Sequence, residues 1–225
     1  MYARILVVLP HPDDEAFGMS GTIAKYISQG AHVTYACLTL GEMGRNMGNP
    51  PFANRVTLPQ VRKQELLESC MALGIQDLRM LGYHDKTIEF ENQDELDAKI
   101  RQLIDEVKPE LVLTFYPGYA VHPDHNATGA AVVRTISRMP KEDRPEVHCA
   151  AFAHNRFQAL GEPDVHVDIR DHLLQKLASI RAHRSQFQAV EMFGGKEPTL
   201  EQLQERFHTE SFYRFRFNDE AAAEA

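Results

Sequence analysis

The fold of this chain is constrained most by two short apolar runs. Each run is followed within a few residues by a motif rich in histidine and aspartate. Ile5–Leu9 precedes the sequence HPDDE at residues 11–15, and Leu111–Phe115 precedes HPDH at residues 122–125. Short continuous apolar runs are typical of strands buried on both faces of a parallel sheet. Because ligands bind such sheets beyond the carboxyl ends of the strands, we expect the two motifs to meet in one site.

Strand and helix patterns alternate along most of the chain. We expect strands at residues 4–9, 31–40, 77–81, 111–115, 147–153 and 165–169, and helices at 16–29, 59–73, 94–107, 124–139 and 171–183. Such alternation predicts an α/β fold with a Rossmann-like, mostly parallel sheet that is flanked by helices on both faces. Residues 1–217 of the 225-residue chain are expected to form a single domain.

The C-terminal segment is less regular. Residues 201–210 are expected to form a helix, and residues 212–217, where aromatic and cationic side chains alternate, a strand with one buried face. We interpret this segment as an edge strand rather than as an aromatic platform for nucleic acid. The polar, alanine-rich residues 218–225 are expected to form a disordered tail.

Composition argues against several classes of function. The formal net charge of −8 disfavours binding to nucleic acid and to anionic membranes. No apolar stretch is long enough to span a bilayer or to form a signal peptide. Cys37, Cys70 and Cys149 are widely spaced, so we expect buried thiols rather than disulfides or a thiolate zinc site. The expectation is a cytoplasmic protein with neither a nucleic-acid nor a membrane partner.

The side chains of the two motifs suit a catalytic metal site. His11, Asp14 and His125 supply two nitrogens and one carboxylate, a donor set that zinc accepts in hydrolases and that ferrous iron accepts as well. Hydrolysis also needs a base for the water and a group that stabilises the oxyanion. Asp13 and His122 remain for these two roles.

A purely structural interpretation competes with this hypothesis. Aspartate after proline is ordinary in turns, and Asp13 or Asp14 can cap the helix that follows. For either motif alone that interpretation is preferable, but two such motifs after two strands of one sheet favour a metal site. Asp124 is expected to orient His122 and to hold the ring protonated, because a nearby anion favours the charged imidazole.

The two motifs resemble those of the LmbE-like, or PIG-L, family of metal-dependent N-acetylglucosamine deacetylases. The similarity continues at GTIA (residues 21–24), RKQE (62–65) and AHRSQF (182–187), so it spans about residues 5–187. The resemblance implies the Rossmann-like fold and the zinc-dependent deacetylase activity of that family. It also implies a role for each motif residue: metal ligands His11, Asp14 and His125, general base Asp13, oxyanion stabiliser or proton donor His122, and its support Asp124.

Within the family, residues 41–51 are most similar to the second type of bacillithiol biosynthesis deacetylase, which acts on N-acetylglucosaminyl L-malate. The two malate carboxylates require a cationic contact. We expect Arg62 to make it, because its family equivalent faces the substrate, with Arg45 as a weaker candidate and Arg55 as a solvated charge. Family members often form trimers or hexamers, so the resemblance also implies a homo-oligomer.

Three alternatives remain open. The substrate of a deacetylase can instead be N-acetylglucosamine itself, a chito-oligosaccharide fragment or a cysteine–sugar conjugate. A nucleotide-binding module is a second alternative, but the first loop lacks the GxGxxG phosphate cradle. A metal-binding protein without turnover is the third, and the presence of both Asp13 and His122 argues against it.

Overall fold

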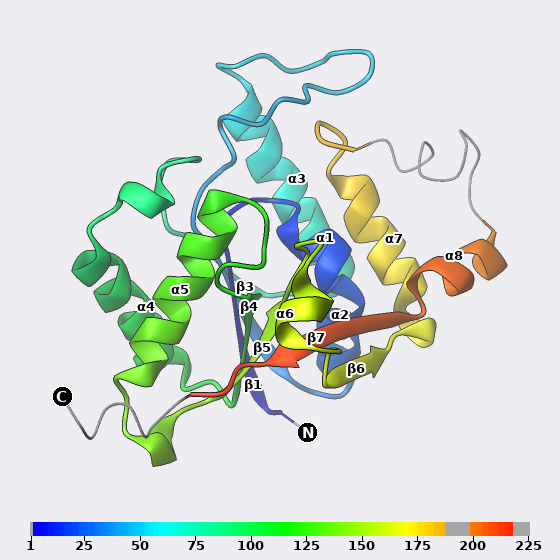
Figure 1. Ribbon diagram of the computed structural model, residues 1–225. Helices are drawn as coiled ribbons and strands as arrows, with labels where there is room; N and C mark the ends of the chain where they lie inside the picture. The colour runs from blue at the N-terminus through cyan, green and yellow to red at the C-terminus, as the bar shows by residue number, and fades with distance from the viewer. Residues whose placement is uncertain (1, 188–198, 218–225) are drawn as a thin grey trace.

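The computed structural model describes residues 2–187 and 199–217, which contain a seven-stranded sheet with helices on both faces (Figure 1). From one edge to the other the strand order is β3-β2-β1-β4-β5-β7-β6. Strands β1 to β5 run parallel, whereas β7 is antiparallel to both of its neighbours. The strands are β1 (Arg4–Leu9), β2 (His32–Cys37), β3 (Asp77–Met80), β4 (Leu111–Phe115), β5 (Glu146–Ala150), β6 (Val165–Asp168) and β7 (Thr209–Arg214). The predicted α/β fold class is therefore confirmed.

Strand β1 shows why helices must cover both faces of this sheet. Ile5, Val7 and Leu9 belong to one core cluster, and Leu6 and Val8 belong to another on the opposite face. All five side chains are fully buried. The first cluster is covered by α2 (Ser20–Ser28), α3 (Leu58–Leu73) and α7 (Leu173–Ala182), and the second by α4 (Gln93–Val107) and α5 (Pro123–Ser137).

Local signals in the sequence set several helix boundaries. Helix α3 has Pro59 in its first turn and ends at Gly74, whose φ of 83° is accessible to glycine without strain. The side chain of Asn92 caps α4 by accepting hydrogen bonds from the N–H groups of Asp94 and Glu95. The shorter helices are α1 (Asp14–Gly18), α6 (Arg156–Leu160), α8 (Leu200–Phe207) and the 3-10 turns Ile88–Phe90, Lys141–Asp143 and Arg170–His172.

Two expectations about individual elements were wrong. The single helix expected over residues 16–29 is broken at Met19, whose φ of −152° is not helical, and Ser20 Oγ instead donates to the Ala16 carbonyl across the break. The break separates α1, which carries Asp14, from α2, which packs on the sheet. Strand β7 is not an edge strand, because β6 pairs along its outer side. Its Phe212 is fully buried in a core cluster.

The topology places an opening for a ligand between β1 and β4. The chain winds outward from β1 to β2 and β3 and then returns to β4 on the other side of β1. In open α/β sheets, such a reversal of strand order leaves a crevice beyond the carboxyl ends of the two strands. The first histidine motif begins two residues after the end of β1, and the second begins seven residues after the end of β4.

Other expectations concern features away from this crevice. All three cysteines are buried and free, as expected. In the described part of the chain, no helix is long and apolar enough to cross a membrane. The tail expected at residues 218–225 lies outside the described residues, and the domain boundary at residue 217 stays a prediction.

Candidate active site

A cavity of about 670 Å³ opens beyond the carboxyl ends of β1 and β4. Seven of the eight side chains that the sequence predicted for the site line this cavity, and they come from four separate segments of the chain. Asp124, the eighth, is fully buried behind them. The seven are His11, Asp13, Asp14, Arg45, Arg62, His122 and His125.

His11, Asp14 and His125 bring three metal-ligating atoms close together. His11 Nδ1 lies 3.4 Å from Asp14 Oδ2 and 3.3 Å from His125 Nε2, and His125 Nε2 lies 3.0 Å from Asp14 Oδ1. Tetrahedral coordination with bonds of about 2.0–2.1 Å separates ligand atoms by about 3.3 Å. The donor set and its spacing therefore fit a divalent cation such as zinc.

Contacts on the far side of each imidazole fix which nitrogen faces this cluster. His125 stacks on Phe115 with ring centroids 4.1 Å apart, and its Nδ1 lies 3.1 Å from the Ala120 carbonyl, to which it donates. His11 Nε2 lies 3.1 Å from carboxylate oxygens of both Asp85 and Asp124. Each ring therefore keeps the lone pair of its other nitrogen for a metal, an arrangement common behind metal-ligating histidines.

The electrostatics of the cluster favour ionised Asp14. Burial opposes the charge on this carboxyl, but the adjacent His125 and His11 outweigh burial and hold its pKa well below the usual range. Burial also works against protonation of His11, yet Asp14, Asp124 and Asp85 together raise the pKa of His11 well above its ordinary value. A concentration of anionic oxygens around two imidazoles is the environment that a cation neutralises.

Two other sets of side chains overlap with this cluster. Ligand atoms of His11, His122 and His125 all lie within 4.8 Å of one another, and so do those of His11, Asp85 and Asp124. The three imidazole rings form a triangle with centroids 5.0–5.3 Å apart. In the second set, the carboxylates of Asp85 and Asp124 both contact His11 Nε2, the nitrogen that faces away from the cluster. This set therefore orients the His11 ring.

Asp13 sits beside the cluster in a conformation that its neighbours impose. Its φ of 102° is strained for an aspartate. Its N–H donates to Glu15 Oε2 over 3.2 Å, and its Oδ2 accepts from Arg62 Nη2 over 2.8 Å. Burial raises the pKa of Asp13 to about 6, although the Arg62 guanidinium acts in the opposite direction. A carboxyl with a pKa near neutrality is suited to accept and return a proton.

The guanidinium of Arg62 is committed to the protein rather than open to the cavity. Besides Asp13, it donates to the carbonyl oxygens of Gly41 and Pro12, and the residue is 3% exposed. It therefore fixes the Asp13 carboxylate and the loop after β2. Its predicted contact with substrate stays a prediction.

Asp124 does not support His122 in the expected way. The Asp124 carboxylate accepts a hydrogen bond from Lys86 N–H over 2.6 Å and contacts His11 Nε2. Only the backbone N–H of Asp124 contacts His122, and it donates to Nδ1 over 3.2 Å. Burial, together with the neighbouring His11 and His125, lowers the pKa of His122 below its ordinary value. The lowered pKa and the N–H that Nδ1 accepts both disfavour the protonated His122 that the sequence predicts, and a neutral ring in this arrangement has its proton on Nε2.

Comparison with known families and proteins identifies the family of this chain. The PIG-L model, described as GlcNAc-PI de-N-acetylase, matches residues 6–136, which include both motifs and the strands before them. This chain belongs to the PIG-L family.

Several PIG-L relatives are similar over most of their length. The probable N-acetyl-alpha-D-glucosaminyl L-malate deacetylase 2 of Bacillus cereus is 56% identical over 190 residues, which cover 84% of this chain and 86% of the relative. The Bacillus subtilis protein of the same name is 48% identical and covers 97% of this chain and all of the relative. The structure of the N,N'-diacetylchitobiose deacetylase of Pyrococcus horikoshii superposes with a TM-score of 0.72 at 27% identity, covering 95% of this chain and 84% of the other.

In this PIG-L member, a buried polar network beneath Asp13 was missed by the interpretation of the sequence. Glu15 Oε1 accepts from Ser69 Oγ over 2.5 Å and lies 2.6 Å from His183 Nε2, while Glu15 Oε2 accepts from Tyr35 over 3.1 Å. Glu15 and His183 are both fully buried. The available signal was the AHRSQF stretch at residues 182–187, which carried the family resemblance but no chemical role.

Asp85 is a second residue of this PIG-L member that the sequence left without a role. It follows β3, and its carboxylate joins two parts of the pocket wall. Oδ1 lies 3.1 Å from His11 Nε2, and Oδ2 accepts from the Met43 N–H over 2.8 Å. Asp85 therefore ties the loop after β2 to the candidate metal site.

Proposed function

We propose that this PIG-L member is a metal-dependent deacetylase that removes the acetyl group from N-acetylglucosaminyl L-malate. The observation that carries the proposal is the convergence of His11, Asp14 and His125, at spacings that fit one cation, beside a strained and partly buried Asp13. The names of the Bacillus relatives support the choice of substrate.

A divalent cation held by His11, Asp14 and His125 would supply Lewis-acid chemistry, because it lowers the pKa of a water ligand and polarises a carbonyl. Zinc is our choice, and ferrous iron accepts the same donors. Both histidine rings are oriented by the contacts behind them, so their ligating nitrogens are arranged before a cation arrives.

Asp13 is the general base of the proposal. Its carboxylate takes one proton from the attacking water as the new bond to the acetyl carbon forms. It then returns this proton to the nitrogen as the C–N bond breaks, so the free amine and acetic acid, which loses its remaining proton to solvent as acetate, leave with no net change in the enzyme. Arg62 holds the carboxylate for both steps through its 2.8 Å contact.

His122 is the proposed oxyanion stabiliser. As a neutral ring with its proton on Nε2, it donates a hydrogen bond to the carbonyl oxygen as negative charge develops there. Asp124 is a positioning residue that acts on His11 and, through its backbone N–H, on His122.

Three further features belong to the same proposal. Residues 1–217 form the catalytic domain, the enzyme works in the cytoplasm, and the protein assembles as a trimer or hexamer. Light scattering of the purified protein tests the last of these.

The proposal is tested by measuring acetate release from a panel of N-acetylglucosaminyl compounds with metal-loaded and chelator-treated protein. We expect kcat/KM to be highest for the malate conjugate, activity to be lost after chelation, and readdition of Zn²⁺ or Fe²⁺ to restore it. Equal rates with N-acetylglucosamine, a chito-oligosaccharide fragment and the malate conjugate would contradict the proposal that the malate conjugate is the specific substrate. Full activity after chelation, with metal absence verified, would contradict the mechanism.

A further inference from the structure

The cavity contains two cationic side chains that are not committed to the protein. Arg45 and Lys86 line the cavity and are exposed. In the part of the chain that the structure describes, neither side chain has a hydrogen-bond or ion-pair partner. Arg62, the third cation of the lining, is committed to Asp13 and to two backbone carbonyls. A cation that enters a pocket without a protein partner is available to an anionic ligand.

The backbone that carries Lys86 is held in a strained conformation. Lys86 has a φ of 67°, which is uncommon for a residue other than glycine, asparagine or aspartate. Its N–H donates to Asp124 Oδ2 over 2.6 Å, and the preceding N–H of Asp85 donates to Glu42 Oε2 over 3.1 Å. The turn after β3 is therefore tied to the metal-site side chains, and Lys86 starts from a fixed point on the pocket wall.

The loop that carries Arg45 is fastened to the same wall. Met43 N–H donates to Asp85 Oδ2, and Arg55 Nη1 donates to the carbonyls of Glu42 and Gly44, over 2.7 and 2.9 Å. Arg55 is exposed, as the sequence led us to expect of a solvated charge, and its two hydrogen bonds also support this loop. Met43 lies two residues before Arg45, and Asp85 immediately precedes Lys86. The hydrogen bond between Met43 and Asp85 therefore connects the two segments that carry the free cations.

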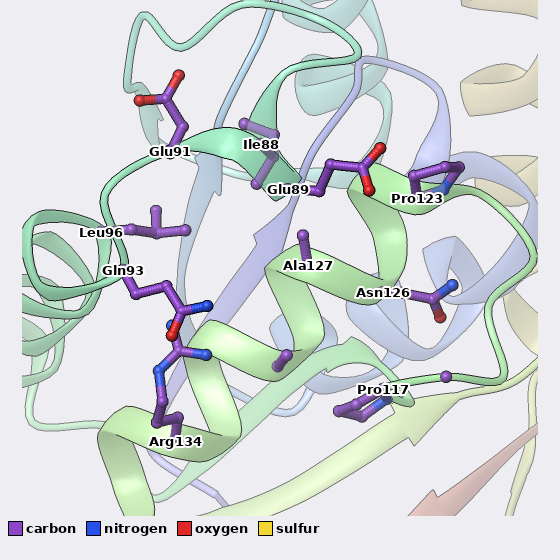
Figure 2. Close-up of a pocket in the computed structure, with 12 residues that line it drawn as sticks. Ile88, Glu89, Glu91, Gln93, Leu96, Pro117, Pro123, Asn126, Ala127 and Arg134 are labelled. Carbon is purple, nitrogen blue, oxygen red and sulfur yellow. The ribbon is translucent and has the colours of Figure 1, made fainter.

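Three of the four acidic groups of the lining are engaged by other side chains of the protein. Among the acidic groups, Asp13 is paired with Arg62, while Asp14 and Asp85 contact the histidines of the candidate metal site. Glu89 is the remaining acid of the lining. It also borders a neighbouring cavity of about 490 Å³, which is lined by α5, the start of α4, the segment before α4 and the loop after β4. Figure 2 shows Glu89 and Pro123 among the residues of its wall.

We propose that Lys86 and Arg45 determine specificity by binding the two carboxylates of the malate group. The inference rests on the proposed function and extends it, because it names the residues that distinguish a dicarboxylate aglycone from a neutral one. Two separate cations match two separate carboxylates, and a charge-assisted hydrogen bond is among the stronger polar contacts in proteins. The proposal does not include Arg62, because its guanidinium already donates to Asp13 and to two backbone carbonyls.

The experiment compares kcat/KM for the malate conjugate with kcat/KM for methyl N-acetylglucosaminide, which has the same sugar and acetyl group but a neutral aglycone. The ratio of the two values is the readout. We expect Lys86→Gln and Arg45→Gln each to lower this ratio at least about tenfold, mainly through KM for the malate conjugate. Lys86→Arg should restore most of it.

Lys63→Gln is the matched control, because Lys63 is an exposed lysine on α3 outside the cavity lining and the charge change is the same. It should leave the ratio unchanged. An unchanged ratio in both Lys86→Gln and Arg45→Gln would overturn the inference, and so would equal losses on both substrates. If the wild-type protein deacetylates neither compound, the proposed function itself is contradicted. If it deacetylates both with a kcat/KM ratio near one, only the proposal that malate is the aglycone is contradicted.

Discussion

Replacing Arg62 with methionine tests how the pocket controls the protonation of Asp13. The Arg62 guanidinium is almost fully buried, and its Nη2 lies 2.8 Å from Asp13 Oδ2. Two unit charges about 4 Å apart interact by about 4 kcal/mol at an effective dielectric constant of about 20, which corresponds to about 3 pKa units. Water that enters the vacated space screens part of this interaction, so we expect the pKa of Asp13 to rise by about 1 to 2 units.

The assay is the pH dependence of kcat/KM for acetate release. Only the ionised carboxylate accepts a proton, so a higher pKa of Asp13 moves the acid limb of the profile toward higher pH by the same amount. The loss in the Arg62→Met variant should therefore be largest at low pH and should shrink as the pH rises above the new pKa.

The control is Lys63→Met, which removes a positive charge from the next residue of the same helix but from an exposed position. It should leave the acid limb in place. Circular dichroism and metal content verify that Arg62→Met is folded and loaded. An acid limb that does not move would refute the reasoning, and a rise in KM alone would instead support the direct substrate contact that the sequence predicts for Arg62.

Two variants test how the fold holds the site. A Cβ at Gly129 would lie 2.2 Å from the Phe115 carbonyl oxygen. Gly129→Ala should therefore lower the free energy of unfolding in urea by about 2 kcal/mol, which is an overpacking cost of about 3 kcal/mol less about 1 kcal/mol gained in helix propensity. An unchanged urea midpoint would contradict the close approach of α5 to β4. Glu210→Gln should cost about 3 kcal/mol, because it leaves buried Lys176 without the carboxylate 2.7 Å from its Nζ. The double variant Lys176→Met/Glu210→Gln should recover part of that loss, and no recovery would argue against the ion pair.

The sequence predicted the site because its residues follow strands that are adjacent in the sheet. The segments after β1 and β4 converge for the topological reason that parallel strands end at the same edge, so local patterns sufficed to bring His11 and His125 together. The position of Asp124 was harder to predict, because an aspartate in the first turn of a helix can point toward several neighbours. Its carboxylate lies on His11, which is 113 positions away in the sequence.

Contacts between distant segments account for most of what the sequence did not reveal. Glu15 and His183 are separated by 168 positions, and no periodicity in either segment indicates that they pair. Similarly, alternating aromatic residues predicted that β7 is a strand with a buried face, but the pairing partners of that strand depend on β6. The commitment of Arg62 to Asp13 is visible only once α3 is placed against the loop after β1.

The most direct test of the central claim is the rate of acetate release by Asp13→Asn protein that is loaded with metal. Asparagine keeps the size of the side chain but cannot take the proton from water. The account predicts a fall in kcat on the order of 10²-fold or more, with metal content equal to that of the wild-type protein, because the proposed ligands are His11, Asp14 and His125. A metal-loaded Asp13→Asn protein with kcat near the wild-type value would contradict the account.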